Sequence, residues 1–247
     1  MPRADEIRAN ISALETRIAA ACARAGRKRS DVTLVAVSKT FPASDVDLAI
    51  EAGMTDIGEN KVQEARDKKP SVARAARWHL IGHLQSNKVK DAARLFDVVQ
   101  TIDSVELAEK IMRSGSSVPR SLGSSVASPE NPAVLPRNRG TEEPGFPELL
   151  LQVNIGREPQ KSGADPEEVA ALAKRIPLRG LMAIPPVGSA EETRPFFREL
   201  RALRDDCGLK ELSMGMTDDF EVAIEEGATI IRIGRAIFGV RAIFGNR

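Results

Sequence analysis

Eight short apolar runs alternate with longer segments of helical periodicity along this chain, and this alternation restricts the fold more than any other feature. Short runs rich in Val, Ile and Leu, separated by helical segments, predict parallel strands that are buried on both faces of a sheet. Eight such units in 247 residues predict a closed (β/α)8 TIM barrel, although an open doubly wound sheet would produce a similar local pattern. The predicted strands are residues 32–37, 55–58, 78–82, 97–102, 149–155, 178–184, 211–214 and 229–233.

The predicted barrel is preceded by one additional helix. Ile7, Ile11, Leu14 and Ile18 recur at helical spacing before the first strand, which predicts an N-terminal helix with one apolar face. The helices between the strands are predicted at residues 43–52, 61–69, 86–95, 104–112, 165–175, 191–206 and 218–226.

One segment interrupts the alternation. In residues 114–147, seven serines, four glycines and six prolines account for 17 of 34 positions, a composition that cannot supply a packed core. We interpret the segment as a flexible insert in a single domain spanning residues 1–247; a loop that binds a partner is the alternative. Because it follows a helix and precedes a strand, it should lie on the barrel face opposite the active site.

The charge balance and the distribution of apolar residues limit the partners. The chain has 36 Lys plus Arg against 35 Asp plus Glu, so it lacks the positive field that binding to nucleic acid requires. No apolar run is long enough to cross a membrane, and the N-terminus lacks the apolar region of a signal peptide. We therefore expect a cytoplasmic protein without nucleic-acid or membrane partners, and we expect a monomer.

A lysine ends the first predicted strand. Lys39 follows the apolar run at 32–37 and should lie at the carboxyl end of that strand, where active sites form in α/β folds. Partial burial lowers the pKa of a lysine and makes its amine a nucleophile toward aldehydes. The alternative is a lysine that extends its amine into solvent.

The last two strands end in residues suited to an anion. Ser213, Gly215 and Thr217 lie in the turn between the seventh strand and its helix, and Arg232 and Gly234 end the eighth strand. Hydroxyls, glycines and main-chain N–H groups at a helix start bind phosphate, and barrels often place phosphate sites after strands seven and eight. An amine at one end and a phosphate site at the other suit a phosphorylated aldehyde, of which pyridoxal 5′-phosphate is the obvious candidate.

Seven motifs are spread over nearly the whole chain outside the insert. They are residues 36–40 (AVSKT), 58–64 (GENKVQE), 78–88 (WHLIGHLQSNK), 161–163 (KSG), 180–186 (GLMAIPP), 213–216 (SMGM) and 232–234 (RIG). These motifs closely resemble those of the pyridoxal phosphate homeostasis protein family and occur in that family's order. The resemblance implies a fold like the barrel domain of alanine racemase, with pyridoxal phosphate held on the lysine that matches Lys39.

The same resemblance implies roles for individual residues. It implies a Schiff base at Lys39 and a pocket lined by Asn60, with Arg232 beside the cofactor on either the phosphate or the pyridine nitrogen. Phosphate contacts are implied for Ser213, the Gly215 region, Thr217 and Gly234. Two positions depart from the family pattern: Thr217 stands where many relatives have serine, and Ala183 stands where threonine is common.

Two histidines raise the possibility of a metal site, which we reject. His79 and His83 are four residues apart, but in a strand that spacing spans roughly 13 Å. We expect no metal site, with one histidine near the rim of the pocket and the other capping the next helix.

A repeated pentapeptide stands near the C-terminus. The sequence RAIFG occurs at residues 235–239 and again at 241–245. Only one copy can occupy a given packing site. The first should pack under the last strand, and the second should form a loosely held tail.

Three functions are compatible with these features. The first is a carrier that buffers pyridoxal phosphate and passes it to apoenzymes. The second is a pyridoxal phosphate-dependent racemase or lyase of weak activity, with Lys39 and His79 as bases. The chain has no tyrosine and ends after its eighth unit, so it lacks the tyrosine base of a racemase of the alanine type, and we expect the carrier rather than an enzyme. The third is a scaffold or regulatory barrel whose partner contacts the insert.

Overall fold

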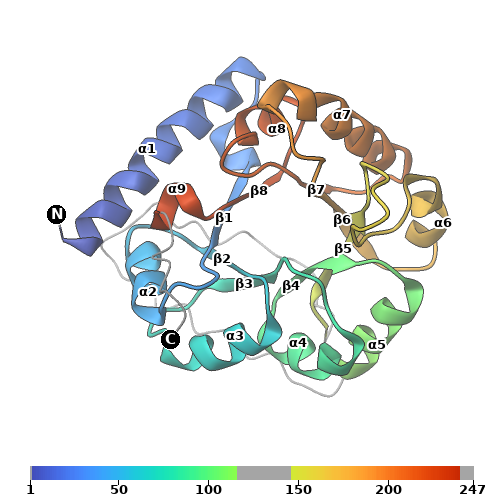
Figure 1. The fold of residues 1–247 in the computed structure, drawn as a ribbon, viewed down its shortest axis with the longest axis horizontal. Helices are drawn as coiled ribbons and strands as arrows, with labels where there is room; N and C mark the ends of the chain where they lie inside the picture. Colours follow the sequence, from blue (N-terminus) through green and yellow to red (C-terminus); the bar gives the residue numbers. More distant parts are fainter. Residues whose placement is uncertain (1, 116–145, 240–247) are drawn as a thin grey trace.

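Eight parallel strands form a closed barrel in the order β1 to β8 (Figure 1). The structure is a computed structural model that describes residues 2–115 and 146–239. The barrel closes where β1 pairs with β8, from Thr33 opposite Ile230 to Ala36 opposite Ile233, so the predicted closed barrel is confirmed and the open sheet is wrong. The strands are β1 Thr33–Val37, β2 Asp56–Glu59, β3 Arg77–Leu80, β4 Val98–Ile102, β5 Glu148–Val153, β6 Leu178–Ala183, β7 Glu211–Ser213 and β8 Ile230–Ile233.

Helices surround the barrel, as Figure 1 shows. They are α2 Ala43–Glu51, α3 Val62–Lys68, α4 Val89–Leu95, α5 Val105–Gly115, α6 Val169–Ala173, α7 Ala190–Asp206 and α8 Phe220–Glu225. Helix α5 continues past the predicted end at residue 112, because the Ser114 hydroxyl bonds to the Lys110 carbonyl and Gly115 is buried one turn after Ile111. Residues 114 and 115 therefore belong to the helix, and residues 116–145 of the predicted insert lie outside the described residues.

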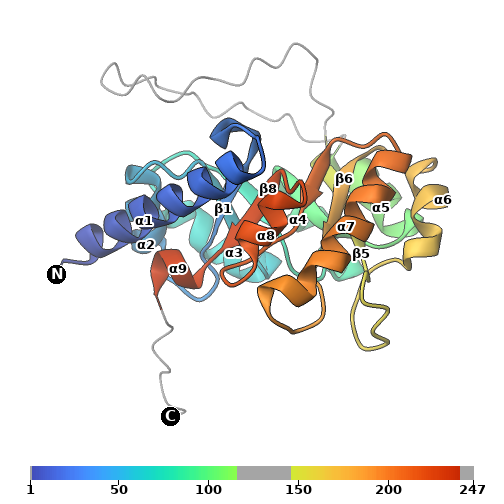
Figure 2. The same cartoon turned by 90° about the horizontal axis from the view of Figure 1, so that it is seen from above.

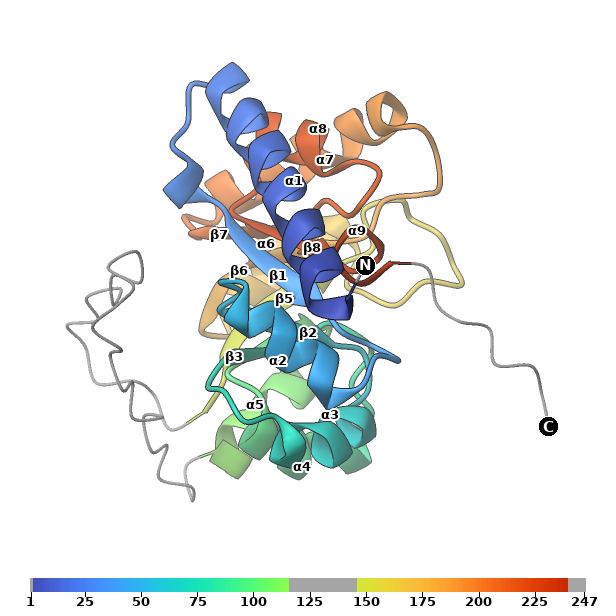
Figure 3. The ribbon, with the colours of Figure 1, turned by 90° about the vertical axis from the view of Figure 1, so that its left-hand side faces the viewer.

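The predicted N-terminal helix is α1, Arg3–Arg24, and its buried face carries the four apolar residues that predicted it. It packs on α2, α8 and the short helix α9, Arg235–Phe238 (Figure 3). Figure 2 shows α9 below the N-terminal part of α1, where Arg3 donates to the Phe238 carbonyl and Asn10 to that of Ile237.

Helix α9 forms most of the first copy of the repeated pentapeptide, and it packs on α1 and on Phe41. Ile237 and Phe238 are buried in the main hydrophobic cluster. The Phe238 ring stacks on Phe41, with 5.1 Å between ring centroids, which places α9 against the loop that follows β1. The second copy, residues 241–245, lies outside the described residues.

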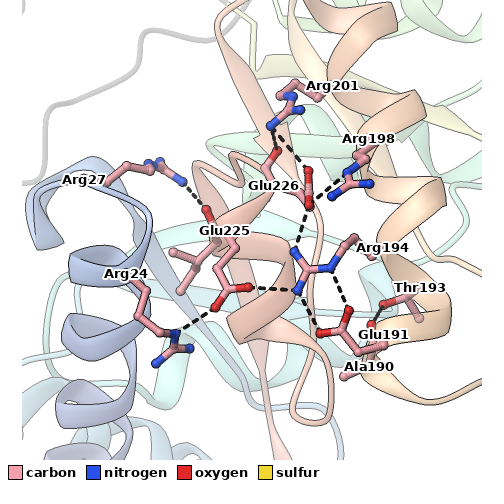
Figure 4. Close-up of polar contacts among 11 residues, drawn as sticks. Arg24, Arg27, Ala190, Glu191, Thr193, Arg194, Arg198, Arg201, Glu225 and Glu226 are labelled. Carbon is pink, nitrogen blue, oxygen red and sulfur yellow. Dashed lines mark hydrogen bonds and ion pairs between the residues drawn. The ribbon is translucent and has the colours of Figure 1, made fainter.

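An ion-pair network joins α1, α7 and α8 (Figure 4). Arg194 of α7 lies 2.9 Å from Glu225 and 2.8 Å from Glu226, and Arg24 of α1 donates to Glu225 at 2.8 Å. These glutamates precede β8, so the network lies toward the amino ends of the strands. The loops that follow the carboxyl ends of the strands lie at the other end of the barrel. Within residues 2–115 and 146–239, no helix is long and apolar enough to cross a membrane.

Candidate binding site

A cavity of about 570 Å³ lies among the residues that end or follow six of the eight strands. Its volume falls within the roughly 300–1,000 Å³ of small-molecule sites. Five of the seven predicted site residues line it: Lys39, Asn60, Thr217, Arg232 and Gly234. The other lining residues are Val37, Phe41, Ile81, Ile184, Met216, Asp218, Arg235 and Gly239. The structure therefore brings the predicted amine and the predicted cation to one cavity.

Lys39 enters the cavity because side chains alternate along β1. A Cβ on Gly58 of the neighbouring strand would meet Val35 and Val37, so these valines lie on the interior side, and residue 39 continues that side at the end of the strand. Lys39 is half-buried. The residue after it, Thr40, has a φ of 71°, a left-handed conformation that is unfavourable for a β-branched side chain.

Arg232 is a buried cation in the wall of the cavity. Its side chain donates to the Ser213 hydroxyl at 2.7 Å and to the Ala183 carbonyl at 3.0 Å. Burial lowers the pKa of Arg232 to about 10, against the opposing influence of the Asp219 charge. At neutral pH the guanidinium therefore keeps its proton and gives this end of the cavity a fixed positive charge.

A chain of hydrogen bonds continues from Arg232 across the barrel interior. The Ser213 hydroxyl donates to Oε1 of Gln100 at 2.6 Å, and Nε2 of Gln100 lies 2.9 Å from Nδ1 of His79. Nε2 of His79 lies 2.9 Å from Oδ1 of Asp56. Since the Gln100 amide nitrogen can only donate, Nδ1 of His79 accepts from it, and Nε2 donates to Asp56.

The carboxylate at the far end of this chain is held in its charged form. Burial raises the pKa of Asp56, but the hydrogen bonds from His79 and Thr55 and the charge of Arg77 outweigh that effect, and the pKa lies below its ordinary value. Arg232 and Asp56 are thus opposite charges joined by a chain of hydrogen bonds through Ser213, Gln100 and His79.

The structure corrects the expectations for the histidines, because His79 does not lie at the rim and neither histidine is the N-cap residue of the turn or helix that follows β3. His79 is completely buried inside the barrel rather than near the rim, and both its ring nitrogens bond to protein atoms, so it cannot act as a base in the cavity. His83 is exposed in the loop after β3, and the 3-10 turn and helix that follow begin after Gln85 and Lys88. Among the described residues, no cluster of three or more His, Cys, Asp and Glu side chains could hold a metal ion.

Ser213 and Gly215 support the site without lining the cavity. The Ser213 hydroxyl is buried and bonds to Arg232 and Gln100, and its contact with a phosphate stays a prediction. Gly215 has a φ of 91°, and a Cβ there would lie 2.6 Å from the Cβ of Ala223. Glycine lets the turn after β7 fold closely onto α8, and this turn carries Thr217 into the cavity.

Asp219 holds this turn and was not predicted as a site residue. Its Oδ1 accepts the main-chain N–H of Met216 at 2.6 Å, and burial raises the pKa of its carboxyl. The sequence signal is an aspartate two positions after Thr217 in a turn, where Asp side chains accept hydrogen bonds from nearby main-chain N–H groups.

The apolar walls and one ion pair were also missed. Ile81, Ile184 and Met216 line the cavity; Ile81 was assigned to a strand that in fact ends at Leu80. Arg235 of α9 lies 2.5 Å from Asp218 at the same cavity. Apolar walls beside an amine, two guanidinium groups and a hydroxyl suit a flat, anionic ligand that carries an electrophilic carbon.

Comparison with known proteins gives matches over almost the whole chain. The family described as "Alanine racemase, N-terminal domain" matches residues 5–242. The pyridoxal phosphate homeostasis protein of Pseudomonas aeruginosa is 41% identical over 242 residues, which cover 94% of each chain.

Solved structures agree with the sequence matches. The structure of PipY from Synechococcus elongatus PCC7942 with PLP bound is 33% identical and has a TM-score of 0.72, covering 94% of this chain and 100% of PipY. Alanine racemase from Bartonella henselae with covalently bound pyridoxal phosphate has a TM-score of 0.66 at 12% identity, over 96% of this chain and 59% of that one. The second match shows a shared barrel fold.

Proposed function

The chain belongs to the pyridoxal phosphate homeostasis protein family, and we propose that it binds pyridoxal 5′-phosphate in this cavity as a carrier that buffers the free cofactor. The observation that carries the proposal is that Lys39 and Arg232 line one cavity of about 570 Å³ together with Thr217 and Gly234. Bound there, the cofactor supplies a reactive aldehyde.

The residues present fit this group. Pyridoxal phosphate has a flat ring, an aldehyde and a phosphate, and the cavity offers apolar walls, a half-buried amine and two guanidinium groups. In the proposed attachment, the Lys39 amine adds to the aldehyde carbon and loses both of its hydrogens. A carbon–nitrogen double bond forms, and the carbonyl oxygen leaves as water, which gives the Schiff base predicted from the sequence.

In this proposal, Arg232 and Arg235 bind different polar groups of the ligand. We assign the phosphate to Thr217, Gly234 and Arg235, because this group combines a hydroxyl, main-chain N–H groups at a helix start and a cation open to solvent. Arg232, fixed deeper by Ser213 and Ala183, is assigned to the pyridine nitrogen. A guanidinium there keeps that nitrogen unprotonated and weakens the electron sink that carbanion chemistry needs.

A carrier fits the described residues better than a racemase or lyase. Asp218 is the one carboxylate among the described lining residues, and it pairs with Arg235. His79 is engaged inside the barrel. Among the described lining residues, neither a histidine nor an unpaired carboxylate is therefore available as a second acid or base.

The proposal is tested by covalent trapping. Purified protein is mixed with pyridoxal 5′-phosphate, reduced with borohydride and mapped by mass spectrometry. Reduction should mark Lys39, and Lys39→Ala should lose the visible chromophore with its fold intact, while Lys61→Ala, which changes an exposed neighbouring lysine, behaves like wild type. An unmarked Lys39 would contradict the Schiff base.

Enzymatic activity is tested separately, by α-carbon deuterium exchange in a panel of amino acids. Exchange at ordinary enzyme rates would favour the racemase or lyase over the carrier. The single domain, the monomeric state, the cytoplasmic location and the transfer to apoenzymes stay predictions.

A further inference from the structure

A buried ion-pair cluster lies beside the main chain that carries Lys39, outside the cavity. Lys68 of α3 donates to the carboxylate of Glu59 at 2.5 Å, to Glu64 at 3.0 Å and to the main-chain carbonyl of Ser38 at 2.8 Å. Glu59 is completely buried, and Lys68 is 9% exposed. Because side chains alternate along β2 and Gly58 faces the interior, Glu59 points outward into the layer between the barrel and α3.

This cluster bonds to the residues on both sides of Lys39. The Ser38 hydroxyl donates to Glu59 at 2.6 Å, and the Ser38 carbonyl accepts from Lys68. On the other side, the Thr40 N–H donates to Glu64. The same carboxylate oxygen of Glu64 also accepts from Lys68, so one buried ammonium ties the two anchors together.

The conformation of Thr40 shows that these anchors hold an unfavourable backbone. A φ of 71° costs a β-branched residue on the order of 1–3 kcal/mol and persists only where surrounding contacts determine it. Buried charges are also costly unless they are paired and fully hydrogen-bonded, yet Oε2 of Glu59 is buried without a hydrogen-bond partner. The first cost falls at Thr40, next to the predicted nucleophile, and the second at Glu59, which bonds to Ser38 on its other side.

We propose that Lys68, Glu59 and Glu64 are positioning residues that fix the main chain on both sides of Lys39 and so present its amine to the cavity. The inference rests on the proposed function of Lys39. It gives a role to Glu59 and Glu64 in the motif at residues 58–64, in which Asn60 is the one residue that lines the cavity. A nucleophile whose backbone is fixed before the ligand arrives reacts faster, because less conformational entropy is lost in the reaction.

The test separates ligand binding from covalent attachment. For Glu64→Ala, we measure the rate at which pyridoxal 5′-phosphate becomes trapped on Lys39, and separately the affinity for pyridoxine 5′-phosphate, which has no aldehyde. Trapping should slow by about 10- to 100-fold, with the affinity for pyridoxine 5′-phosphate unchanged. Glu64→Gln, which keeps an acceptor for the Thr40 N–H, should recover most of the rate.

Neighbouring residues supply matched controls. Gln63→Ala changes an exposed position of the same helix and should load like wild type. Lys68→Met should slow the trapping of the cofactor on Lys39. Lys69→Met removes a cation that donates to the Leu95 carbonyl, and it should leave the trapping rate unchanged.

Hydrogen exchange gives a readout without any ligand. In the ligand-free protein, the Thr40 amide should exchange at least about tenfold faster in Glu64→Ala than in wild type, because it loses its acceptor. Wild-type trapping and exchange rates in Glu64→Ala would overturn the inference. If wild type itself never becomes attached at Lys39, the proposed function fails, and the exchange experiment still decides whether the cluster holds this segment.

Discussion

Ser213 and Arg232 are joined by a hydrogen bond of 2.7 Å below the cavity, and both side chains are buried. The bond fixes one terminal nitrogen of the guanidinium, and the Ala183 carbonyl fixes the other. Ser213 therefore positions Arg232, and Thr217 is the predicted hydroxyl that lines the cavity.

Replacing Arg232 should weaken cofactor binding. Arg232→Gln removes a charge-assisted hydrogen bond worth about 1.5–3 kcal/mol, so affinity should fall by about 10- to 150-fold. Equilibrium dialysis with pyridoxal 5′-phosphate measures it. The control is Arg198→Gln, which removes a cation of α7 that pairs with Glu226. It should leave the affinity for the cofactor unchanged. Wild-type affinity in Arg232→Gln would place Arg232 outside the site.

Gln100 should affect binding although it does not line the cavity. Gln100→Leu leaves the Ser213 hydroxyl and Nδ1 of His79 without their partner in the barrel interior. We expect a loss of about 1–3 kcal/mol in the free energy of unfolding, with weaker cofactor binding because Arg232 is less firmly held. Urea denaturation and dialysis measure the two effects. Gln63→Leu, on the exposed face of α3, should change neither, and unaltered affinity in a folded Gln100→Leu would refute the link.

Gly215→Ala and Gly208→Ala separate backbone strain from steric overlap. Both glycines have positive φ, 91° and 64°, but a Cβ on Gly208 meets nothing within 4 Å, whereas one on Gly215 overlaps Ala223. Alanine at residue 208 should cost about 1–2 kcal/mol of unfolding free energy. Alanine at residue 215 should cost about 1–3 kcal/mol more and weaken binding by moving the turn that carries Thr217. Equal losses in urea denaturation would show that the turn relaxes freely.

Acid should weaken the contact between α8 and its neighbours. Hydrogen bonds from Arg194 and Arg24 hold the pKa of Glu225 below its ordinary value. Ionised Glu225 therefore stabilises the fold above its unfolded pKa of about 4.3, and this contribution is lost as the pH falls through the folded pKa. Glu225→Gln should be less stable than wild type at neutral pH by about 1 kcal/mol.

Denaturation curves from neutral to acid pH measure this contribution. The difference between Glu225→Gln and wild type should narrow as the pH falls. Glu109→Gln, which removes an exposed partner of Arg113, is the control. A difference that stays constant with pH would refute the assignment.

The local sequence pattern was sufficient to predict the strands and helices and the residues at the carboxyl ends of the strands. Lys39 lies two residues after β1, and Arg232 belongs to β8. The parallel pairing of β1 with β8 therefore brings both residues toward the same end of the barrel. The roles of Ser213 and His79 could not be predicted in the same way. Ser213 and Gln100 are 113 residues apart and meet because the closed barrel places β4 and β7 across one interior.

By itself, the sequence determined the order of strands and helices, the additional helix α1 and the strand end at which Lys39 lies, because side-chain periodicity and chain direction are local properties. Closure of the sheet through the pairing of β1 with β8 was decided by the tertiary structure. The tertiary structure alone decided which polar side chains meet across the barrel interior and between barrel and helix. It directed Ser213 to Arg232, enclosed His79 between Asp56 and Gln100, and set Lys68 beside Lys39. Contacts of this kind depend on closure and packing, which no local pattern encodes.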